Sequence, residues 1–248
     1  MKKTLIVIPA RYASTRFPGK PLALLGGRPI VQWVWERVQG LGEAMIATDD
    51  ERIADAAKAG FNARVMMTSA DCQSGTDRCG EVLRRCGGGY EVVVNVQGDE
   101  PFVEAAQVQT LVAAFDDPAV QIATLRTRIR TTEELLSPNN VKVVCADNGN
   151  ALYFSRQPLP YRRGTAEEEW LAEGVYYKHV GIYAYRAEVL ERLCQLPVGT
   201  LEASEKLEQL RWLAAGYTIR VLDTDHANIG IDTPQDLAEA EQTLNRTK

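Results

Sequence analysis

The loop that follows the first apolar run of the chain has the composition of a phosphate-binding loop. Residues 11–21, RYASTRFPGKP, carry the cations Arg11, Arg16 and Lys20, no acid, and hydroxyl groups that include Ser14. A triphosphate needs several charge-assisted donors, and a glycine between two prolines offers close backbone approach on a stiff loop. We therefore expect this loop to bind phosphate, the alternative being a solvated basic loop. It matches neither the dinucleotide-binding glycine motif nor the P-loop motif.

Two carboxylates stand where a cation that accompanies a triphosphate would need them. Asp99 follows the apolar run at 92–96, in the segment NVQGDEP, and Asp232 lies in the segment IDTP. Mg²⁺ on a triphosphate takes one or two carboxylates, and phosphate oxygens add to its shell. Each aspartate also has a structural interpretation. Asp99 could serve a turn, and Asp232 could favour the N-terminus of a helix from Thr233, which is the stronger interpretation of its spacing alone.

The composition excludes several classes of protein. The 248 residues are 45% hydrophobic and 25% charged, which is typical of a globular chain and not of a disordered, coiled-coil or collagen-like one. The net charge of −5 argues against a nucleic-acid partner. No apolar run has the length of a membrane helix, and the run at 5–8 is too short for a signal peptide, so we expect no membrane association. The five cysteines form no C-x-x-C pair, which favours reduced thiols in the cytoplasm over a zinc site.

Apolar runs and amphipathic stretches alternate through the first half of the chain. Continuous apolar runs predict strands at 5–10, 44–48, 63–68, 92–96 and 120–125. Helical patterns lie between them at 30–38, at 51–59 with Gly60 closing the helix, at 76–86 and at 107–115. Fully apolar strands that alternate with helices predict an α/β fold with a doubly wound, mostly parallel sheet. Ligands bind beyond the carboxyl ends of such strands, where the cationic loop and Asp99 are expected.

The pattern changes in the second half. The runs 141–144 and 151–154 flank Asn148-Gly149, which predicts a β-hairpin, and residues 157–174 predict a loop or mobile segment. Alternation at 176–186 predicts a strand with His179 and Tyr183 on one face, about 13 Å apart at ~3.3 Å per residue. The remaining elements are helices at 187–196 and 201–216, a strand at 219–222 and a helix from Thr233. We expect a single domain over residues 1–248, with the region from about 127 to 186 inserted into the sheet.

Seven segments, in their order along the chain, resemble those of one enzyme family. They are CQSGTDR (72–78), VVVNVQGDEP (92–101), NNVKVV (139–144), ALYFSR (151–156), HVGIYAYR (179–186), EKLEQLRWL (205–213) and IDTPQDL (231–237). With the N-terminal IPARYASTRFPGKPL, they resemble the 3-deoxy-manno-octulosonate (Kdo) cytidylyltransferases, the CMP-Kdo synthetases of lipopolysaccharide biosynthesis. The resemblance covers nearly the whole chain.

The resemblance implies a nucleotidyltransferase with the fold of the nucleotide-diphospho-sugar transferases. The implied reaction transfers CMP from CTP to Kdo and gives CMP-Kdo and pyrophosphate, with Mg²⁺ as the cofactor. The anomeric hydroxyl of the sugar acid would attack the α-phosphorus in line, without a covalent enzyme intermediate. The resemblance also implies a homodimer, with the inserted hairpin as the contact.

Roles for individual residues follow from the same resemblance. The nucleotide-binding set is Arg11, Ser14, Lys20, Gln73, Ser74 and Gln97, with Gln73 and Ser74 near the cytosine. The metal ligands are Asp99 and Asp232, and the catalytic set is Arg11, Lys20, Asp99 and Asp232. The sugar-binding set is Gln97, Arg156, Arg163 with Arg162 as the alternative, His179, Tyr183, Glu208 and Gln209. We expect Glu208 and Gln209 to be adjacent on one helix, and we assign binding rather than proton transfer to His179.

Three other functions remain open at this point. A cytidylyltransferase for another acidic sugar, such as a sialic acid or a modified Kdo, would use the same cationic loop. A hexose-1-phosphate nucleotidyltransferase would use a phosphate as the attacking group and would not need Arg156 for a carboxylate. A non-catalytic nucleotide-binding regulator could dispense with one of the two metal carboxylates, so the presence of both Asp99 and Asp232 argues against it.

Overall fold

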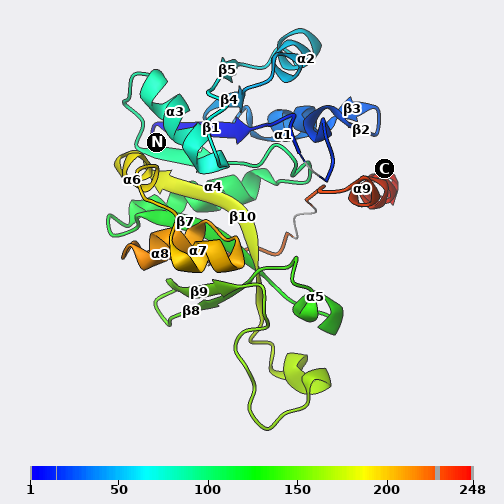
Figure 1. The fold of residues 1–248 in the computed structure, drawn as a ribbon, viewed down its shortest axis with the longest axis vertical. Coiled ribbons are helices and arrows are strands. Elements are labelled where there is room, and N and C mark those ends of the chain that lie inside the picture. The colour runs from blue at the N-terminus through cyan, green and yellow to red at the C-terminus, as the bar shows by residue number, and fades with distance from the viewer. Residues whose placement is uncertain (1, 15, 227–229, 247–248) are drawn as a thin grey trace. The chain divides into compact units, whose positions relative to one another are not determined.

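The chain divides into two units in the computed structural model (Figure 1). The first unit comprises Met1–Val112 and Asn228–Lys248, and the second comprises Ala113–Ala227. The structure describes residues 2–14, 16–226 and 230–246. The single domain with an insertion at about 127–186 stays a prediction.

Parallel strands in the order β6-β1-β4-β5 form the sheet of the first unit. Their bounds are β1 Thr4–Pro9, β4 Glu43–Thr48, β5 Val65–Met67 and β6 Val92–Asn95. Every residue of β1 and β6 is buried, as the unpatterned apolar runs predict for a parallel sheet. The mostly parallel α/β sheet is therefore confirmed, and the carboxyl ends of β1 and β6 lie at the same edge.

Three helices connect these strands and pack against them (Figure 1): α1 Ile30–Val38, α2 Glu51–Phe61 and α3 Gly75–Arg85. A short antiparallel pair, β2 Leu24–Leu25 and β3 Arg28–Pro29, precedes α1, and a 3₁₀ turn spans Lys20–Leu22. Helix α4 Ala105–Ala113 follows β6, and the C-terminal helix α9 Pro234–Arg246 contacts β2. The prediction that Gly60 closes α2 is wrong. The helix continues to Phe61 because Asn62 takes up the left-handed conformation that ends it, with φ 52°.

The second unit contains an antiparallel hairpin and a mixed set of strands. Its strands are β7 Ile122–Arg128, β8 Lys142–Cys145, β9 Ala151–Ser155, β10 Tyr177–Arg186 and β11 Ile219–Asp223. Strand β7 pairs antiparallel with β10 and parallel with β11. The predicted hairpin is confirmed, since β8 and β9 pair antiparallel around Gly149, whose φ is +80°.

Several helical segments of the second unit differ from the predictions. Its helices are α5 Thr132–Leu136, α6 Ala187–Leu193, α7 Thr200–Glu205 and α8 Gln209–Ala214, with 3₁₀ turns at Ala114–Asp116 and Glu167–Glu173. Helix α5 was not predicted. The single helix predicted at 201–216 is two helices, because Lys206 is left-handed (φ 55°) and ends α7. The predicted loop at 157–174 contains the 3₁₀ turn Glu167–Glu173.

Candidate functional site

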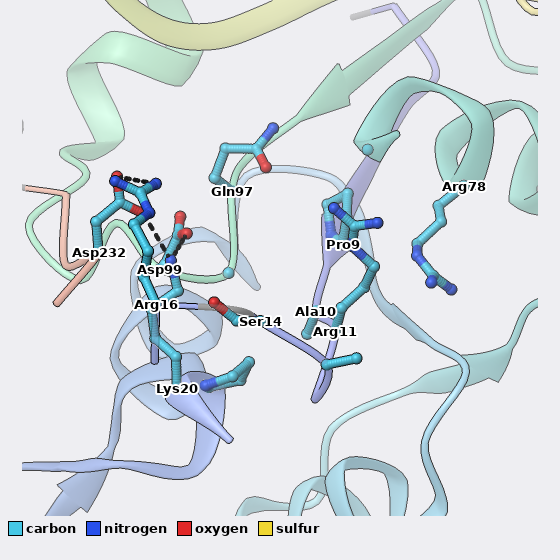
Figure 2. Close-up of a pocket in the computed structure, with 14 residues that line it drawn as sticks. Pro9, Ala10, Arg11, Ser14, Arg16, Lys20, Arg78, Gln97, Asp99 and Asp232 are labelled. Atoms are coloured by element: carbon cyan, nitrogen blue, oxygen red, sulfur yellow. Dashed lines mark hydrogen bonds and ion pairs between the residues drawn. The ribbon is translucent and has the colours of Figure 1, made fainter. Parts of the chain in front are cut away.

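A pocket in the first unit opens at the carboxyl ends of β1 and β6 (Figure 2). Its volume is about 390 Å³. The residues that line it come from the cationic loop, the start of α3, the turn after β6 and the segment before α9: Pro9, Ala10, Arg11, Ala13, Ser14, Arg16, Lys20, Pro21, Gly75, Arg78, Gln97, Gly98, Asp99 and Asp232. The cationic loop and both candidate metal carboxylates are therefore brought together, as predicted for the ligand-binding edge of such a sheet.

Two glycines allow the backbone to close around this pocket. Gly19 has φ +71°, and a Cβ there would lie 2.9 Å from the ring of Tyr12. The Gly19 amide donates to the Tyr12 carbonyl at 2.9 Å, which folds the cationic loop back on itself. A Cβ on Gly98 would lie 2.8 Å from the Pro9 carbonyl oxygen. Only glycine fits at these two points, so the loops after β1 and β6 can approach each other closely.

Lys20 joins the two aspartates that are predicted to hold a metal. Its Nζ lies 2.5 Å from Asp99 Oδ2 and 3.0 Å from Asp232 Oδ1. The guanidinium of Arg16 lies 2.9 Å from the other oxygen of Asp232. Lys20 is 8% exposed, so its ammonium is largely withdrawn from water. Figure 2 shows Arg16, Asp99 and Asp232 grouped on one side of the pocket, with Arg78 on the other.

The pKa shifts in this group follow from burial and charge. Burial alone would lower the pKa of Lys20, but the charge of Asp99 and the hydrogen bonds to Asp99 and Asp232 raise it above its usual value. Burial would likewise raise the pKa of Asp232, and the hydrogen bond from Lys20 with the charges of Lys20 and Arg16 lowers it instead. Lys20 is therefore cationic and Asp232 anionic throughout the neutral pH range.

The residues present fit a hard divalent cation that shares its shell with a ligand. Because Asp99 and Asp232 both contact one ammonium nitrogen, a single positive centre can reach both carboxylates. Within the described ranges, no group of three or more His, Cys, Asp or Glu side chains could hold a metal ion. Two carboxylates from the protein, completed by phosphate oxygens and water, are what Mg²⁺ on a triphosphate requires.

The other predicted nucleotide residues divide between the pocket and its margin. Arg11, Ser14 and Gln97 line it, and Arg11 also donates to the Gln73 carbonyl at 3.4 Å. Gln73 and Ser74 do not line it. The Ser74 hydroxyl accepts from the Asp77 amide at 3.1 Å and caps α3. Placement near a cytosine stays a prediction for both of these residues.

Two arginines of the pocket, Arg16 and Arg78, were not among the individually assigned site residues, although Arg16 belongs to the cationic loop. Arg16 pairs with Asp232, as described above. Arg78 is 1% exposed and donates to Asp49 at 2.7 Å and to the Thr68 hydroxyl at 2.6 Å, while its Nε has no hydrogen-bond partner among the described residues. Arg78 is the fourth residue of α3, where a positive charge is unfavourable because it lies near the positive end of the helix dipole. This unfavourable position is the feature of the sequence that could have marked Arg78 as a functional residue.

The predicted sugar-binding residues, Gln97 apart, lie in the second unit, where aromatic rings form a cluster. The rings of His179 and Tyr183 are 5.2 Å apart, and Tyr183 also contacts Tyr185 and Trp212, at 6.0 and 5.1 Å between ring centroids. The predicted separation of about 13 Å is therefore wrong. The register of β10 against β7 shifts between Val180 and Tyr183, so an even rise per residue does not apply there.

Burial decides the protonation of this cluster. Burial lowers the pKa of His179 to about 3, so its ring is neutral at physiological pH, and its Nε2 lies 2.9 Å from the Thr124 hydroxyl. Burial and the charge of Glu208 raise the pKa of Tyr183 well above its usual value. Tyr183 Oη is buried and has no hydrogen-bond partner of acceptable geometry among the described residues. A buried hydroxyl without such a partner is uncommon in folded proteins, which makes Tyr183 a candidate for contact with a polar ligand.

The remaining sugar-set residues lie on turns and helix ends. Glu208 is the N-terminal cap of α8 and Gln209 is its first residue, 6% exposed, so the two are adjacent at the start of one helix. Arg162 donates to the Trp170 carbonyl at 3.3 Å, whereas Arg163 is exposed. The turn after β9 holds Arg156, whose contacts are described below.

A buried lysine lies beneath Arg156. Lys142 has no exposed surface, and its Nζ donates to the carbonyl oxygens of Ser137 at 2.9 Å and Arg156 at 2.5 Å. Burial and the charge of Arg156 lower the pKa of Lys142 to about 8, against the opposing charge of Glu205. This ammonium is therefore partly deprotonated in mildly alkaline solution.

We expect Lys142 to make stability rise with pH. Between its folded pKa of about 8 and its ordinary value of 10.5, the unfolded chain binds more protons than the folded chain. The free energy of unfolding therefore gains on the order of 1–3 kcal/mol from this residue across that window. Urea unfolding at pH 7.5 and 9.5 of the native chain and Lys142→Met measures the effect. The difference between the two proteins should shift in favour of the native chain at the higher pH, and a difference that is independent of pH would contradict the assignment.

No helix within the described residues is long and apolar enough to cross a membrane.

Comparison with known proteins identifies the family. A family model described as cytidylyltransferase matches residues 5–219. The 3-deoxy-manno-octulosonate cytidylyltransferase of Phocaeicola vulgatus is 54% identical, with 98% of each chain covered, and that of Bacteroides thetaiotaomicron is also 54% identical over 98% of each chain. A solved structure of a CMP:2-keto-3-deoxy-manno-octonic acid synthetase complexed with CTP is 42% identical, with a TM-score of 0.90 over 99% of this chain and 100% of that one.

More distant structures share the fold alone. A 4-diphosphocytidyl-2C-methyl-D-erythritol synthase from Anaerococcus prevotii is 15% identical, with a TM-score of 0.65 over 99% of each chain. The near relatives, by contrast, match at half of all positions over almost the full length, and the family model spans both units. The chain therefore belongs to the cytidylyltransferase family, among the 3-deoxy-manno-octulosonate cytidylyltransferases.

Proposed function

We propose that this protein transfers CMP from CTP to Kdo and releases pyrophosphate. The observation that carries the proposal is the pairing of Asp99 and Asp232 on Lys20, in a pocket that the cationic loop lines, in a chain of this family. Such a pocket has donors for a triphosphate and two carboxylates for the cation that accompanies it. The names of the near relatives and the CTP complex of the structural neighbour support the choice of CTP and Kdo.

The chemistry needs positioning and charge neutralisation rather than a protein nucleophile. Arg11, Ser14 and Lys20 would bind the triphosphate, while Gln73 and Ser74 would approach the cytosine. When the nucleotide binds, the Lys20 ammonium would leave the carboxylates and contact the phosphates. Its positive charge would there stabilise the negative charge that develops on the leaving pyrophosphate. Asp99 and Asp232 would then hold Mg²⁺. When bound, this cation supplies charge neutralisation on the phosphates and a lower pKa for the attacking hydroxyl.

The sugar acid would be held by side chains suited to a polyol with a carboxylate. Arg156 can bind the carboxylate through two parallel N–H bonds, with Arg163 or Arg162 assisting. The remaining members of the proposed set offer neutral and acidic partners for the hydroxyl groups: Gln97, His179, Tyr183, Glu208 and Gln209. The neutral ring of His179 and the unsatisfied Tyr183 hydroxyl support a binding role rather than proton transfer.

The proposal extends to assembly and place of action. We propose a homodimer in which the β8–β9 hairpin forms the contact, and Leu152 on β9, which is 63% exposed, is an apolar residue available for it. We also propose that the enzyme acts in the cytoplasm and that its product serves lipopolysaccharide biosynthesis. Size-exclusion chromatography with light scattering would test the dimer, and a monomer at micromolar concentration would contradict it.

The decisive experiment is a pyrophosphate-release assay with CTP and Mg²⁺ against a panel of acceptors. We expect release with Kdo and little release with sialic acid or with a hexose 1-phosphate. Release with sialic acid but not Kdo would overturn the proposed substrate. Release with the hexose 1-phosphate alone would overturn the acid-sugar class as a whole.

Replacing Arg156 with alanine should raise the KM for Kdo by about 10²-fold, because a charge-assisted pair of hydrogen bonds is worth roughly 1.5–3 kcal/mol for each partner group. The dissociation constant for CTP, measured by calorimetry without the sugar, should stay within about twofold of the native value. Arg192→Ala on the exposed face of α6 is the control. An unchanged KM for Kdo would remove Arg156 from the sugar-binding set.

A further inference from the structure

Glu205, the last residue of α7, accepts hydrogen bonds from two consecutive residues, Ser155 and Arg156. Its Oε1 accepts from the Ser155 hydroxyl at 2.6 Å, and its Oε2 accepts from the Arg156 amide at 3.0 Å. The Glu205 carbonyl also accepts from Arg156 Nε at 2.7 Å. One residue thus fixes the place of the Arg156 backbone and the direction of its guanidinium.

The guanidinium of Arg156 is held by backbone carbonyls alone. Besides the Glu205 carbonyl, Nη1 donates to Pro138 O at 3.0 Å and Nη2 to Lys206 O at 3.5 Å. In the described part of the chain, no carboxylate forms an ion pair with it. Three of its five N–H donors are therefore used on neutral acceptors, which leaves two donors and no carboxylate in direct contact with the guanidinium. Two donors and a full positive charge match one carboxylate of a ligand.

The break between α7 and α8 creates two of these acceptors. In a continuous helix, the carbonyls of Glu205 and Lys206 would accept from amides four residues ahead. Because Lys206 adopts φ 55° and ends α7, both carbonyls stay outside the helical ladder and are available to Arg156. From the other side, Lys142 holds the Arg156 carbonyl, so residue 156 is fixed at its amide, its carbonyl and its side chain.

From this geometry we propose that Glu205 is a positioning residue for the sugar acid, which aims Arg156 at the carboxylate of the substrate. The inference rests on the proposed function, in which Arg156 binds that carboxylate. Both carboxylate oxygens of Glu205 already accept from Ser155 and Arg156, so its effect would pass through Arg156.

The test is Glu205→Gln, which keeps the length of the side chain but offers one carbonyl oxygen in place of two. Its NH2 group cannot accept, so one of the two positions that accept from Ser155 and Arg156 is lost, and the turn that carries Arg156 is held less firmly. We expect the KM for Kdo to rise about tenfold, since small displacements of positioning groups are costly. The dissociation constant for CTP, measured by calorimetry, should stay within about twofold. Ser155→Ala removes the Oε1 contact together with the bond that the Ser155 hydroxyl accepts from the Gln157 amide, and it leaves the Oε2 contact to the Arg156 amide in place. It should raise the KM for Kdo less, and it provides a second variant if Glu205→Gln is poorly folded.

A double-mutant cycle separates positioning from general damage to the fold. In the Arg156→Ala background, Glu205→Gln should add nothing to the KM for Kdo, because its target is absent. Glu191→Gln, an exposed acid on α6, is the matched control and should leave every constant unchanged. Additive effects of the two changes, or an equal loss of CTP affinity, would overturn the inference.

The outcomes also distinguish this inference from the proposed function. If Arg156→Ala leaves the KM for Kdo unchanged, the assigned role of Arg156 fails and the inference fails with it. If Arg156→Ala raises that KM while Glu205→Gln and Ser155→Ala do not, the proposed function stands and only the positioning role is overturned.

Discussion

Replacing Asp99 with asparagine is expected to lower kcat by about 10²–10³-fold, the usual loss when one preorganised electrostatic group is removed from an active site. Asparagine keeps the shape of the side chain and one oxygen, but it removes the negative charge that Lys20 contacts at 2.5 Å. The charge that would hold Mg²⁺ against the triphosphate is lost with it. Pyrophosphate release at saturating CTP and Kdo measures the effect, over a series of Mg²⁺ concentrations.

The control for this change is Asp55→Asn, an exposed acid on α2. It should keep native activity and the native response to Mg²⁺. Thermal unfolding of both variants shows whether the pocket is intact. Full activity of a folded Asp99→Asn protein would remove Asp99 from both the catalytic and the metal-binding sets.

Replacing Lys20 with methionine should also lower kcat by about 10²–10³-fold, and it should make the protein more responsive to Mg²⁺. In the structure, the ammonium of Lys20 contacts both Asp99 and Asp232. Without it, Arg16 is the remaining partner of Asp232 in the pocket, and the two carboxylates repel each other. A divalent cation would then relieve this repulsion, so adding Mg²⁺ in the absence of nucleotide should raise the Tm of Lys20→Met more than that of the native chain.

This second measurement does not depend on turnover. Lys58→Met, at an exposed position of α2, is the control and should respond to Mg²⁺ as the native chain does. An equal Tm response in Lys20→Met and the native chain would contradict the view that the lysine and the cation compete for the same carboxylates.

Local signals were enough to predict most elements of this fold. The apolar runs that became β1, β4 and β6 need no distant partner to be recognised, because burial on both faces leaves them without polar positions. The turn at Asn148-Gly149 is equally local, since it depends on the conformational freedom of two residues. The phosphate loop was visible for the same reason, as its charge and its glycine are properties of a single short segment.

The failures arose where distant contacts override local preference. The residues around Lys206 have a continuous helical pattern, but Arg156 takes up two of the carbonyls that a continuous helix would use. Even spacing along 176–186 suggested that His179 and Tyr183 are far apart, whereas the register shift of β10 accompanies rings in contact. Arg78 is noticed only once it is seen to be buried beside the pocket, because its ion pair with Asp49 joins residues that are 29 positions apart.

The sequence by itself determined the class of fold, the cationic loop and the two aspartates, because residue type and local spacing carry those properties. It could not decide between a metal ligand and a helix-terminal residue for Asp232, nor indicate what orients Arg156. The tertiary structure places the Asp232 carboxylate on Lys20, 212 positions away, and it orients Arg156 by ending α7 at Lys206. The metal role of Asp232 stays a prediction. The contact of Asp232 with Lys20 and the orientation of Arg156 both depend on where the backbone turns. A sequence shows which groups are charged or can form hydrogen bonds, but their partners are fixed only when segments remote in the chain pack together.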